Sequence, residues 1–197
     1  MKVLLYGSTR MTEEVASFLW MEGHTIVGFV PCHKDPTVPG HMTAPKCLGP
    51  DLPEHDLALS VQYDRILEPT PKLWNLHTGL LPDWGGCDIL YHTLKAEALE
   101  QGLTFHKITE GLDAGPVLAR TRYPVWPTVD TIPVLYGRML DMIGPFAVWC
   151  VNTIDDHKGN PPLRLPSAPT LYKRGRIAEE DREEYVKVRA ILRRRFG

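Results

Sequence analysis

An α/β fold built on a mostly parallel, twisted sheet with helices on both faces is the fold class that this sequence predicts. Short apolar runs alternate with helix-periodic segments, in the order strand, turn, helix, strand that is typical of parallel sheets. Hydrophobic residues make up 43% of the 197 residues, so the chain can bury a core of ordinary size. Its net charge of −2 argues against broad electrostatic binding of nucleic acid.

The first of these units is Rossmann-like in its order of elements. A β-rich run over residues 2–6 ends at Gly7, and a helical pattern follows from Met11 to Leu19. Residues 24–30 again resemble a strand. A dinucleotide-binding turn carries three glycines, whereas this turn carries one. We therefore expect the fold without the dinucleotide site.

The later elements are expected from periodicity, length and flanking residues. Residues 31–55 are rich in Pro, Gly, His and Lys and predict a loop. A long helix over about 129–155 is expected to bend at Gly144-Pro145. The remaining expected elements are strands over 56–61, 73–77, 103–108 and 117–122, and a helix over 88–100 that is stopped by Gly102.

One domain is expected over residues 1–158, followed over 159–197 by a Pro-rich linker and a short C-terminal helical appendage packed on the same domain. Residues 173–197 carry nine Lys or Arg and five Asp or Glu, a net charge of +4. The acidic residues come first and the basic residues last, which complements the helix dipole. A phosphate-binding role for this helix is the alternative interpretation.

We expect a soluble, cytoplasmic protein without a membrane segment. The chain has no run of 18 apolar residues, and its N-terminus becomes polar too soon for a signal peptide. The four cysteines are therefore expected to be free thiols. Cys32, His33 and Cys47 lack the CxxC pairing of zinc sites, so no metal is expected.

Two polar side chains stand at the end of the apolar run 73–77. Asn75 and His77 are two residues apart, so on a strand their side chains point to the same face. Ligands bind beyond the carboxyl ends of parallel strands, and a turn-rich segment that leaves room for one follows here. A satisfied structural polar group is the alternative for either residue alone.

A carboxylate stands between glycines after the next predicted strand. Asp113 lies between Gly111 and Gly115, and glycines permit the turns and close approach that aim a side chain into the same cleft. His106 precedes it on the strand. A simple turn is the alternative interpretation of this loop.

These residues resemble the folate-dependent formyltransferase family. The family pattern is Asn-x-His-x-Ser/Gly-Leu-Leu-Pro, followed further along the chain by Asp-x-Gly. Both blocks occur here in that order, as Asn75 to Pro82 and Asp113 to Gly115. The similarity extends from residue 1 to about residue 150. It implies a formyltransferase catalytic domain with 10-formyltetrahydrofolate as co-substrate.

The resemblance implies that Asn75, His77 and Asp113 are catalytic. A substrate amine attacks the formyl carbon, and the amide of Asn75 or a protonated His77 stabilises the oxyanion. His77 moves protons between the amine and the departing nitrogen. Asp113 orients His77, favours its charged form and helps to hold a water. His106 is a supporting residue.

The folate-binding residues that the resemblance implies act mainly through backbone groups. They lie in the loop before the Asn-x-His motif and in the loop around the aspartate: Gln62, Tyr63, Asp64, Ile66, Leu67, Thr109, Gly111 and Leu112. Core packing is the alternative for Ile66 and Leu67.

Substrate contacts are expected at two places. Ser8, Thr9 and Arg10 begin a predicted helix, and a helix N-terminus suits a phosphate. Trp84 follows the Leu-Leu-Pro run, where many family members have an Arg or Lys close to the glycine. The mouth of the substrate site is therefore expected to differ from theirs.

The expected acceptor is the primary amine of a small phosphorylated metabolite, in the first place an amino-sugar nucleotide. Pro169 to Arg174 resemble the run that follows the catalytic core in sugar-nucleotide formyltransferases and in peptide-synthetase formylation domains. Glycinamide ribonucleotide formyltransfer, formyltetrahydrofolate hydrolysis and a non-catalytic folate-binding module are the alternatives. The initiator tRNA is disfavoured by the net charge and the short tail, and a homodimer is left open.

Overall fold

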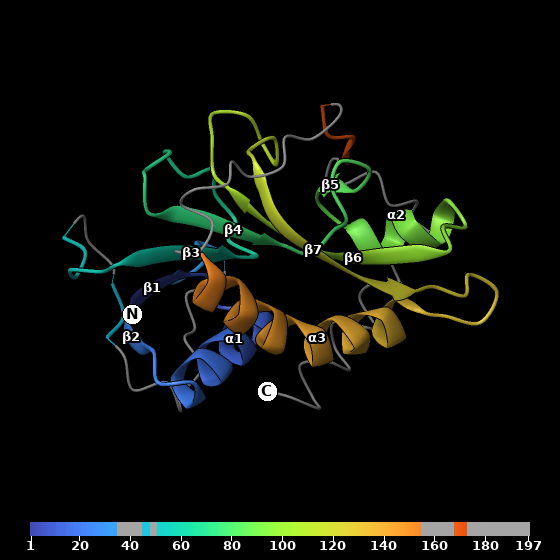
Figure 1. Ribbon diagram of the computed structural model, residues 1–197. Coiled ribbons are helices and arrows are strands. Elements are labelled where there is room, and N and C mark those ends of the chain that lie inside the picture. The colour runs from blue at the N-terminus through green and yellow to red at the C-terminus, as the bar shows by residue number, and fades with distance from the viewer. Residues whose placement is uncertain (35–44, 48–50, 155–167, 173–197) are drawn as a thin grey trace.

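A six-stranded sheet in the order β2-β1-β3-β4-β6-β7 forms the centre of the molecule (Figure 1). The computed structural model describes residues 1–34, 45–47, 51–154 and 168–172. The first four strands in this order are parallel, β6 is antiparallel to β4, and β7 is antiparallel to β6. The mostly parallel α/β fold is therefore confirmed. The strands are β1 (Lys2–Tyr6), β2 (Thr25–Val30), β3 (Leu57–Val61), β4 (Leu73–His77), β6 (Glu100–Lys107) and β7 (Val117–Pro124).

The described helices are α1 (Arg10–Met21), α2 (Ile89–Lys95) and α3 (Ile132–Thr153). α1 and α3 pack on each other and lie beneath the sheet in Figure 1. Gly144 permits this approach, because a Cβ at that position would overlap the ring of Phe18. α2 lies at the β6 end of the sheet and contacts α3. The expected helices are thus unevenly distributed, with both long ones on the same face.

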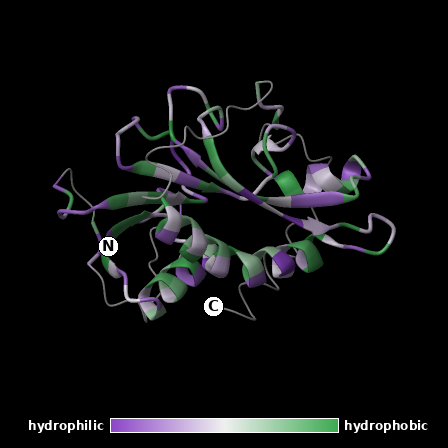
Figure 2. Cartoon of the chain, in the orientation of Figure 1, coloured by the Kyte–Doolittle hydropathy of each residue, from purple (hydrophilic) through white to green (hydrophobic). Residues whose placement is uncertain are grey.

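Period-two alternation divides the strands between two faces. The larger core cluster unites α1 and α3 with one set of strand residues, which includes Trp74, Leu76, Leu103 and Phe105. The alternate residues Leu4, Ala58 and Leu73 form a small cluster of their own. In Figure 2, green apolar stretches occur both in the sheet and in the helices beneath it, among white and purple stretches. The face opposite the long helices is left for polar side chains.

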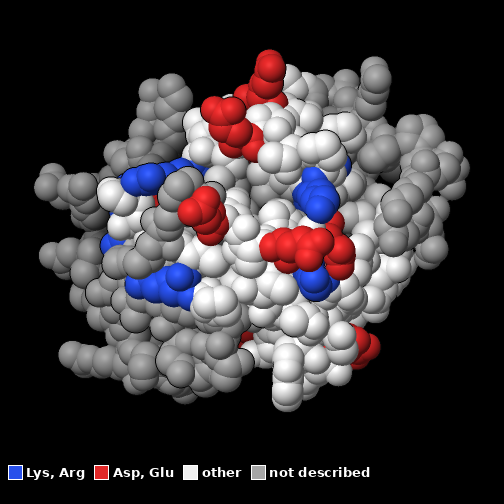
Figure 3. All heavy atoms as spheres, turned by 90° about the vertical axis from the view of Figure 1, so that its left-hand side faces the viewer, with Lys and Arg blue, Asp and Glu red and all other residues white. Residues whose placement is uncertain are grey.

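By length and composition, α3 could cross a membrane, with a mean hydropathy of 1.3 over its most apolar window. It contributes a stripe to the larger core cluster, and 39% of that window is buried inside the fold. The stripe consists of Leu135, Met139, Ile143, Ala147, Cys150 and Val151. On the face of the molecule drawn in Figure 3, charges of both signs are interspersed among uncharged residues.

The predicted C-terminal end of one helix is wrong, and two short strands were not predicted. α2 ends at Lys95, because Glu97 adopts a left-handed φ of +51° and residues 100–102 pair with β7. Gly102, expected to stop a helix, therefore lies in a strand. β5 (Gly85–Gly86) and β8 (Leu171–Tyr172) form a separate two-stranded parallel sheet. The predicted Pro-rich linker and C-terminal helix lie outside the described residues, apart from 168–172.

Candidate active site

Strands β4 and β6 place four polar side chains on the face opposite α1 and α3. Asn75 and His77 alternate with core residues of β4, and His106 and Thr104 alternate with core residues of β6. The antiparallel register sets Asn75 opposite His106 and His77 opposite Thr104. The prediction that Asn75 and His77 share a face is therefore confirmed.

The loop between β6 and β7 carries Asp113 to these side chains. Asp113 has a left-handed φ of +51°, which is uncommon for a residue with a side chain. Its Oδ1 lies 3.8 Å from Nδ1 of His77 and 3.7 Å from Nε2 of His106. Gly115 completes the turn, where a Cβ would overlap the carbonyl of Lys107. Backbone strain at a buried carboxylate that meets two imidazoles is typical of a functional site.

The amide of Asn75 is held by two acceptors. Its Nδ2 donates to Nε2 of His106 at 3.0 Å and to Oδ1 of Asp113 at 3.4 Å. The Nδ1 atom of His106 lies 3.0 Å from the backbone carbonyl of Lys107, which can only accept. Nδ1 of His106 therefore donates to that carbonyl, and Nε2 accepts from the Asn75 amide and orients it. This arrangement fits the supporting role expected of His106.

His77 is a buried, neutral imidazole with a defined tautomer. Its Nε2 lies 2.7 Å from the backbone carbonyl of Trp84 and must donate to it, so the lone pair stays on Nδ1, the atom that faces Asp113. Burial lowers the pKa of His77, while Asp113 and the Trp84 carbonyl act to raise it and His106 lowers it further. Asp113 thus acts in the expected direction, but burial outweighs it, and the ring is uncharged at neutral pH.

Asp113 is a carboxylate over the whole neutral range. Burial alone would raise its pKa, but contact with His106, the nearby His77 and a hydrogen bond from the Gly86 amide lower it to about 2. The Gly86 nitrogen donates to Oδ2 at 2.7 Å. The site therefore combines a fixed negative charge with an uncharged base.

Two buried residues that sequence reasoning missed hold the loop after β4. Gln101 accepts a hydrogen bond from the Leu80 amide at 2.8 Å through Oε1. Thr104 donates to the Gly79 carbonyl at 2.7 Å and accepts from the Leu81 amide at 3.1 Å. The sequence did carry a signal for Thr104. It lies two residues before His106, so on a strand the two side chains point to the same face.

Two glycines let this loop approach the site. A Cβ on Gly79 would overlap the Trp84 carbonyl and lie 2.7 Å from Nε2 of His77. Gly86 has a φ of +88°, which turns its amide toward Asp113. Both imidazole and carboxylate are thus contacted by backbone atoms of residues 84–86, a contribution that side-chain patterns cannot reveal.

The loop predicted to bind folate begins at the carboxyl end of β3, next to β4. Gln62 has a left-handed φ of +52°. The carboxylate of Asp64 accepts two backbone N–H groups of the segment after β2, and Tyr63 lies edge-on to an aromatic ring of β1. Leu67 packs on the small core cluster, whereas Ile66 is 84% exposed. Core packing therefore explains Leu67 but not Ile66.

The second predicted folate-binding group directly precedes Asp113 in the chain. Thr109, Gly111 and Leu112 belong to the loop between β6 and β7, and the side chain of Leu112 is 49% exposed. Ile66 and Leu112 thus present apolar side chains to solvent from the two loops that flank the polar cluster.

The start of α1 uses its polar groups within the fold. Thr9 is the N-cap, and it forms a reciprocal capping box with Thr12. The Ser8 hydroxyl accepts a backbone N–H from the chain after β2 at 3.0 Å. Arg10 pairs with Glu13 at 2.7 Å. These residues lie at the carboxyl end of β1, on the same edge of the sheet as the end of β4.

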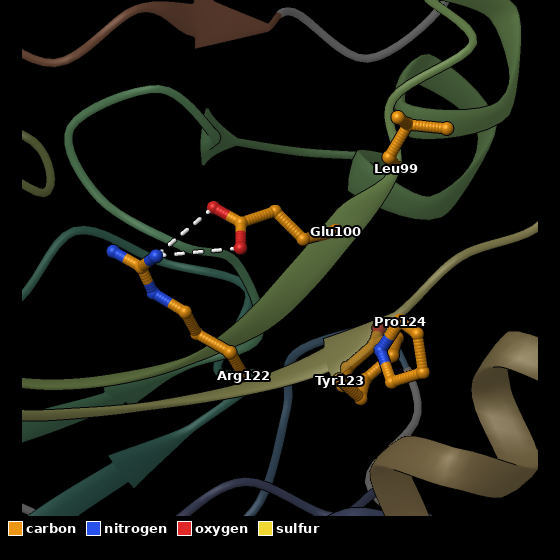
Figure 4. Close-up of a pocket in the computed structure, with 5 residues that line it drawn as sticks. All are labelled: Leu99, Glu100, Arg122, Tyr123 and Pro124. Carbon is orange, nitrogen blue, oxygen red and sulfur yellow. Dashed lines mark hydrogen bonds and ion pairs between the residues drawn. The ribbon is translucent and has the colours of Figure 1, made fainter.

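Two surface depressions lie away from the polar cluster. One, of about 280 Å³, lies at the outer end of β6 and β7, where Arg122 pairs with Glu100 at 3.2 Å (Figure 4). The other, of about 320 Å³, lies between α2 and the start of α3. None of the predicted site residues lines either one. Among the described residues, no group of three His, Cys, Asp or Glu is arranged for a metal, and all four cysteines are free.

The sequence between Glu54 and Gly144 matches the family model described as formyl transferase. The matched residues 54–144, a little under half of the chain, resemble the formyl transferase family. The matched span is narrower than the expected 1–150, and it contains both blocks of the formyltransferase pattern, from Asn75 to Pro82 and from Asp113 to Gly115.

Curated relatives of this formyltransferase segment include a methionyl-tRNA formyltransferase from Stenotrophomonas maltophilia. It is 32% identical over 93 residues, which cover 44% of this chain and 30% of that protein. The chain thus matches about a third of the length of such a relative.

Solved formyltransferases share the fold. An N-formyltransferase from Helicobacter canadensis, in complex with folinic acid and dTDP-3-aminofucose, gives a TM-score of 0.73 at 18% identity, covering 88% of this chain and 71% of that one. Glycinamide ribonucleotide transformylase 1 from Symbiobacterium toebii gives 0.67 at 16% identity, covering 85% and 95%. These similarities confirm the fold class.

Proposed function

We propose that this protein transfers the formyl group of 10-formyltetrahydrofolate to a primary amine. The observation that carries the proposal is the convergence of Asn75 and His77 from β4 with Asp113 from the loop after β6, two separate segments of the sequence, on one cluster. Buried polar groups are costly to bring together. Their assembly here supplies a hydrogen-bond donor, an uncharged base and a fixed negative charge.

Each side chain has a distinct task in this proposal. Nδ1 of His77 takes a proton from the attacking amine and later gives it to the departing folate nitrogen. Nδ2 of Asn75 exchanges its 3.4 Å hydrogen bond to Asp113 for one to the formyl oxygen as negative charge develops there. Asp113 stabilises the imidazolium that forms transiently and holds a water for proton transfer. The balance is one new carbon–nitrogen bond, one broken carbon–nitrogen bond and one proton moved.

The loops beside the cluster suit a folate. 10-Formyltetrahydrofolate, when bound, supplies an activated formyl carbon. Ile66 and Leu112 offer exposed apolar side chains to a flat ring system, and the backbone groups of the loops that contain Gln62 and Gly111 would make its polar contacts. Tyr63, Asp64 and Thr109 complete the proposed folate site, and Leu67 supports its loop by packing on the small core cluster.

An amino-sugar nucleotide is the acceptor class that we propose first. The Helicobacter canadensis enzyme was solved with such a compound, and Ser8, Thr9 and Arg10 offer a helix start to its phosphates, with Trp84 at the mouth. The alternative acceptor is glycinamide ribonucleotide, which the Symbiobacterium toebii structure supports. Methionyl-tRNA is the acceptor named for the curated relative, and the net charge of −2 favours a small molecule. A cytoplasmic location and a homodimer complete the proposal.

The test is optical measurement of tetrahydrofolate release from 10-formyltetrahydrofolate with a panel of amines. The panel holds 3-amino and 4-amino sugar nucleotides, glycinamide ribonucleotide, methionyl-tRNA and a control without amine. We expect turnover with an amino-sugar nucleotide and loss of turnover in His77→Ala. Equal release without amine would instead indicate a hydrolase. Folate binding without turnover of any acceptor would indicate a binding module.

A further inference from the structure

Strand β8 attaches the last described residues of the chain to the active-site loop. Gly85 pairs with Leu171 and Gly86 with Tyr172. The Gly85 amide donates to the Thr170 carbonyl and the Cys87 amide to the Tyr172 carbonyl, each at 2.9 Å. Residues far from the catalytic motifs in sequence therefore form the only strand that pairs with β5 in the part of the chain the structure describes.

The other edge of β5 faces the catalytic groups. The Gly86 amide, which lies between the two amides that bind β8, donates to Asp113 at 2.7 Å. The Trp84 carbonyl accepts from His77 at 2.7 Å. Alternate backbone groups of a strand point to opposite sides. One edge of β5 therefore pairs with β8, and the backbone groups on the other edge contact His77 and Asp113.

The Tyr172 side chain adds a second attachment. Its ring is stacked on Trp84, with centroids 5.4 Å apart, and on His92, with centroids 4.4 Å apart. A Cβ on Gly86 would overlap the Tyr172 backbone, so the two strands are in direct contact. The ring thus fixes the residue whose carbonyl sets the tautomer of His77.

We propose that Tyr172 is a positioning residue: by its stacking on Trp84 and its pairing with β5, it holds the Trp84 carbonyl on His77 and the Gly86 amide on Asp113. The kinetic consequence rests on the proposed formyl transfer, whereas the effect on His77 does not. Tyr172 does not contact the reacting groups itself and acts through residues 84–86.

Loss of the ring should release Trp84 and with it the acceptor for Nε2 of His77. Neutral imidazole then places its proton on either nitrogen, and Nδ1 carries the lone pair only part of the time. We expect kcat of Tyr172→Ala to fall roughly tenfold to hundredfold, the range that follows from small misplacement of a catalytic group. The KM for 10-formyltetrahydrofolate should stay within about twofold. Tyr172→Phe keeps the stacking and should restore the wild-type rate.

The experiment combines these kinetics with nitrogen-15 NMR of the histidine rings in the full chain. The His77 signals are identified by their loss in His77→Gln. We expect protonated Nε2 in the wild type and in Tyr172→Phe, and a mixture of tautomers in Tyr172→Ala. Trp20→Ala is the matched control, because Trp20 is 71% exposed on α1, away from the site; it should match the wild type.

Folding is checked first by the circular dichroism and urea midpoint of each variant. If a folded Tyr172→Ala keeps the wild-type His77 tautomer, the positioning role is overturned. Should Tyr172→Ala fail to fold, Tyr172→Leu is used in its place, since it fills the space without an aromatic face. A wild type that turns over no acceptor refutes the proposed function alone, because the NMR result still decides the effect on His77.

Discussion

Two groups of polar residues lie near the carboxyl edge of the parallel strands, and their partners differ in kind. At the start of α1, Thr9 bonds Thr12 and Arg10 pairs with Glu13, each three residues away in the chain. At β4, the partners of Asn75 lie 31 and 38 residues away. Local partners are those of a helix cap. Partners that come from distant segments indicate a cluster with a role other than helix capping, such as a functional site.

Burial sharpens the contrast. His77, His106 and Asp113 are 7%, 2% and 7% exposed, so each must be desolvated when the protein folds. The guanidinium of Arg10 is 36% exposed and partly solvated. Substitution in the β4 cluster should therefore affect chemistry strongly, and substitution at the start of α1 weakly.

The largest effect is expected at His77 and Asp113. His77→Ala and Asp113→Asn should each lower kcat by about 10³-fold, within the range of general acid–base catalysis. Because the two residues act as one unit, the double variant should be no slower than the worse single variant by more than about threefold. Tetrahydrofolate release under saturating amine measures this. Multiplicative effects would show that the two side chains act independently.

Asn75 is expected to rank next. Asn75→Ala removes the donor that meets the formyl oxygen and should lower kcat by about 10²-fold. His106→Gln retains a hydrogen-bond acceptor for the Asn75 amide and should lose roughly tenfold or less. The order of these two variants is the check, since His106 orients Asn75 and contacts Asp113 but has no contact with the formyl group in this proposal. A larger loss in His106→Gln would assign His106 a direct part in the reaction.

Periodicity and motif spacing were sufficient to predict most of the sheet and the shared face of Asn75 and His77. Alternation along β4 sets both side chains opposite the helices, and the glycines around Asp113 permit the turn that its φ of +51° requires. These are properties of single segments. They can be inferred from residues close in sequence.

Properties that depend on distant segments could not be inferred. The end of α2 is set by pairing of Glu100–Gly102 with β7, and the tautomer of His77 is set by a backbone carbonyl. The charge state of His77 depends on burial, which outweighs Asp113. The pairing of β5 with β8 leaves no side-chain pattern, because two glycines form one of its strands.

His77 and Asp113 respond differently when the pH is lowered. The pKa of His77 lies below its ordinary 6.5, so kcat/KM should be flat near pH 7 and fall at a pH below 6.5, when the base becomes protonated. Asp113, with a pKa of about 2, stays ionised throughout. The measurement is kcat/KM between pH 5 and pH 8 (roughly the range in which histidine titrates). An acid limb centred above pH 6.5 would contradict the buried, neutral imidazole.

The free energy of unfolding should also fall on acidification. Both groups bind protons more readily in the unfolded chain, so each contributes stability above its unfolded pKa that is lost on acidification. For Asp113, a fall from 3.8 to about 2 corresponds to roughly 2 kcal/mol, lost between about pH 4 and pH 2. Urea midpoints of the wild type and Asp113→Asn measure this term. Parallel pH profiles of the two proteins over that interval would show that the carboxylate makes no such contribution.

The smallest effect is expected at the start of α1. If Arg10 contacts a phosphate of the acceptor, Arg10→Ala should raise the acceptor KM only about two- to fivefold and leave kcat unchanged, because Glu13 and Glu14 already offset the guanidinium. Glu13→Gln should act in the opposite sense, because it removes one of the carboxylates that pair with Arg10, and should lower that KM. Arg122→Ala is the matched control, since Arg122 pairs with Glu100 at the outer end of β7 and should change neither constant. An unchanged KM in both α1 variants would restrict this helix start to its structural role and place the phosphates of the acceptor elsewhere.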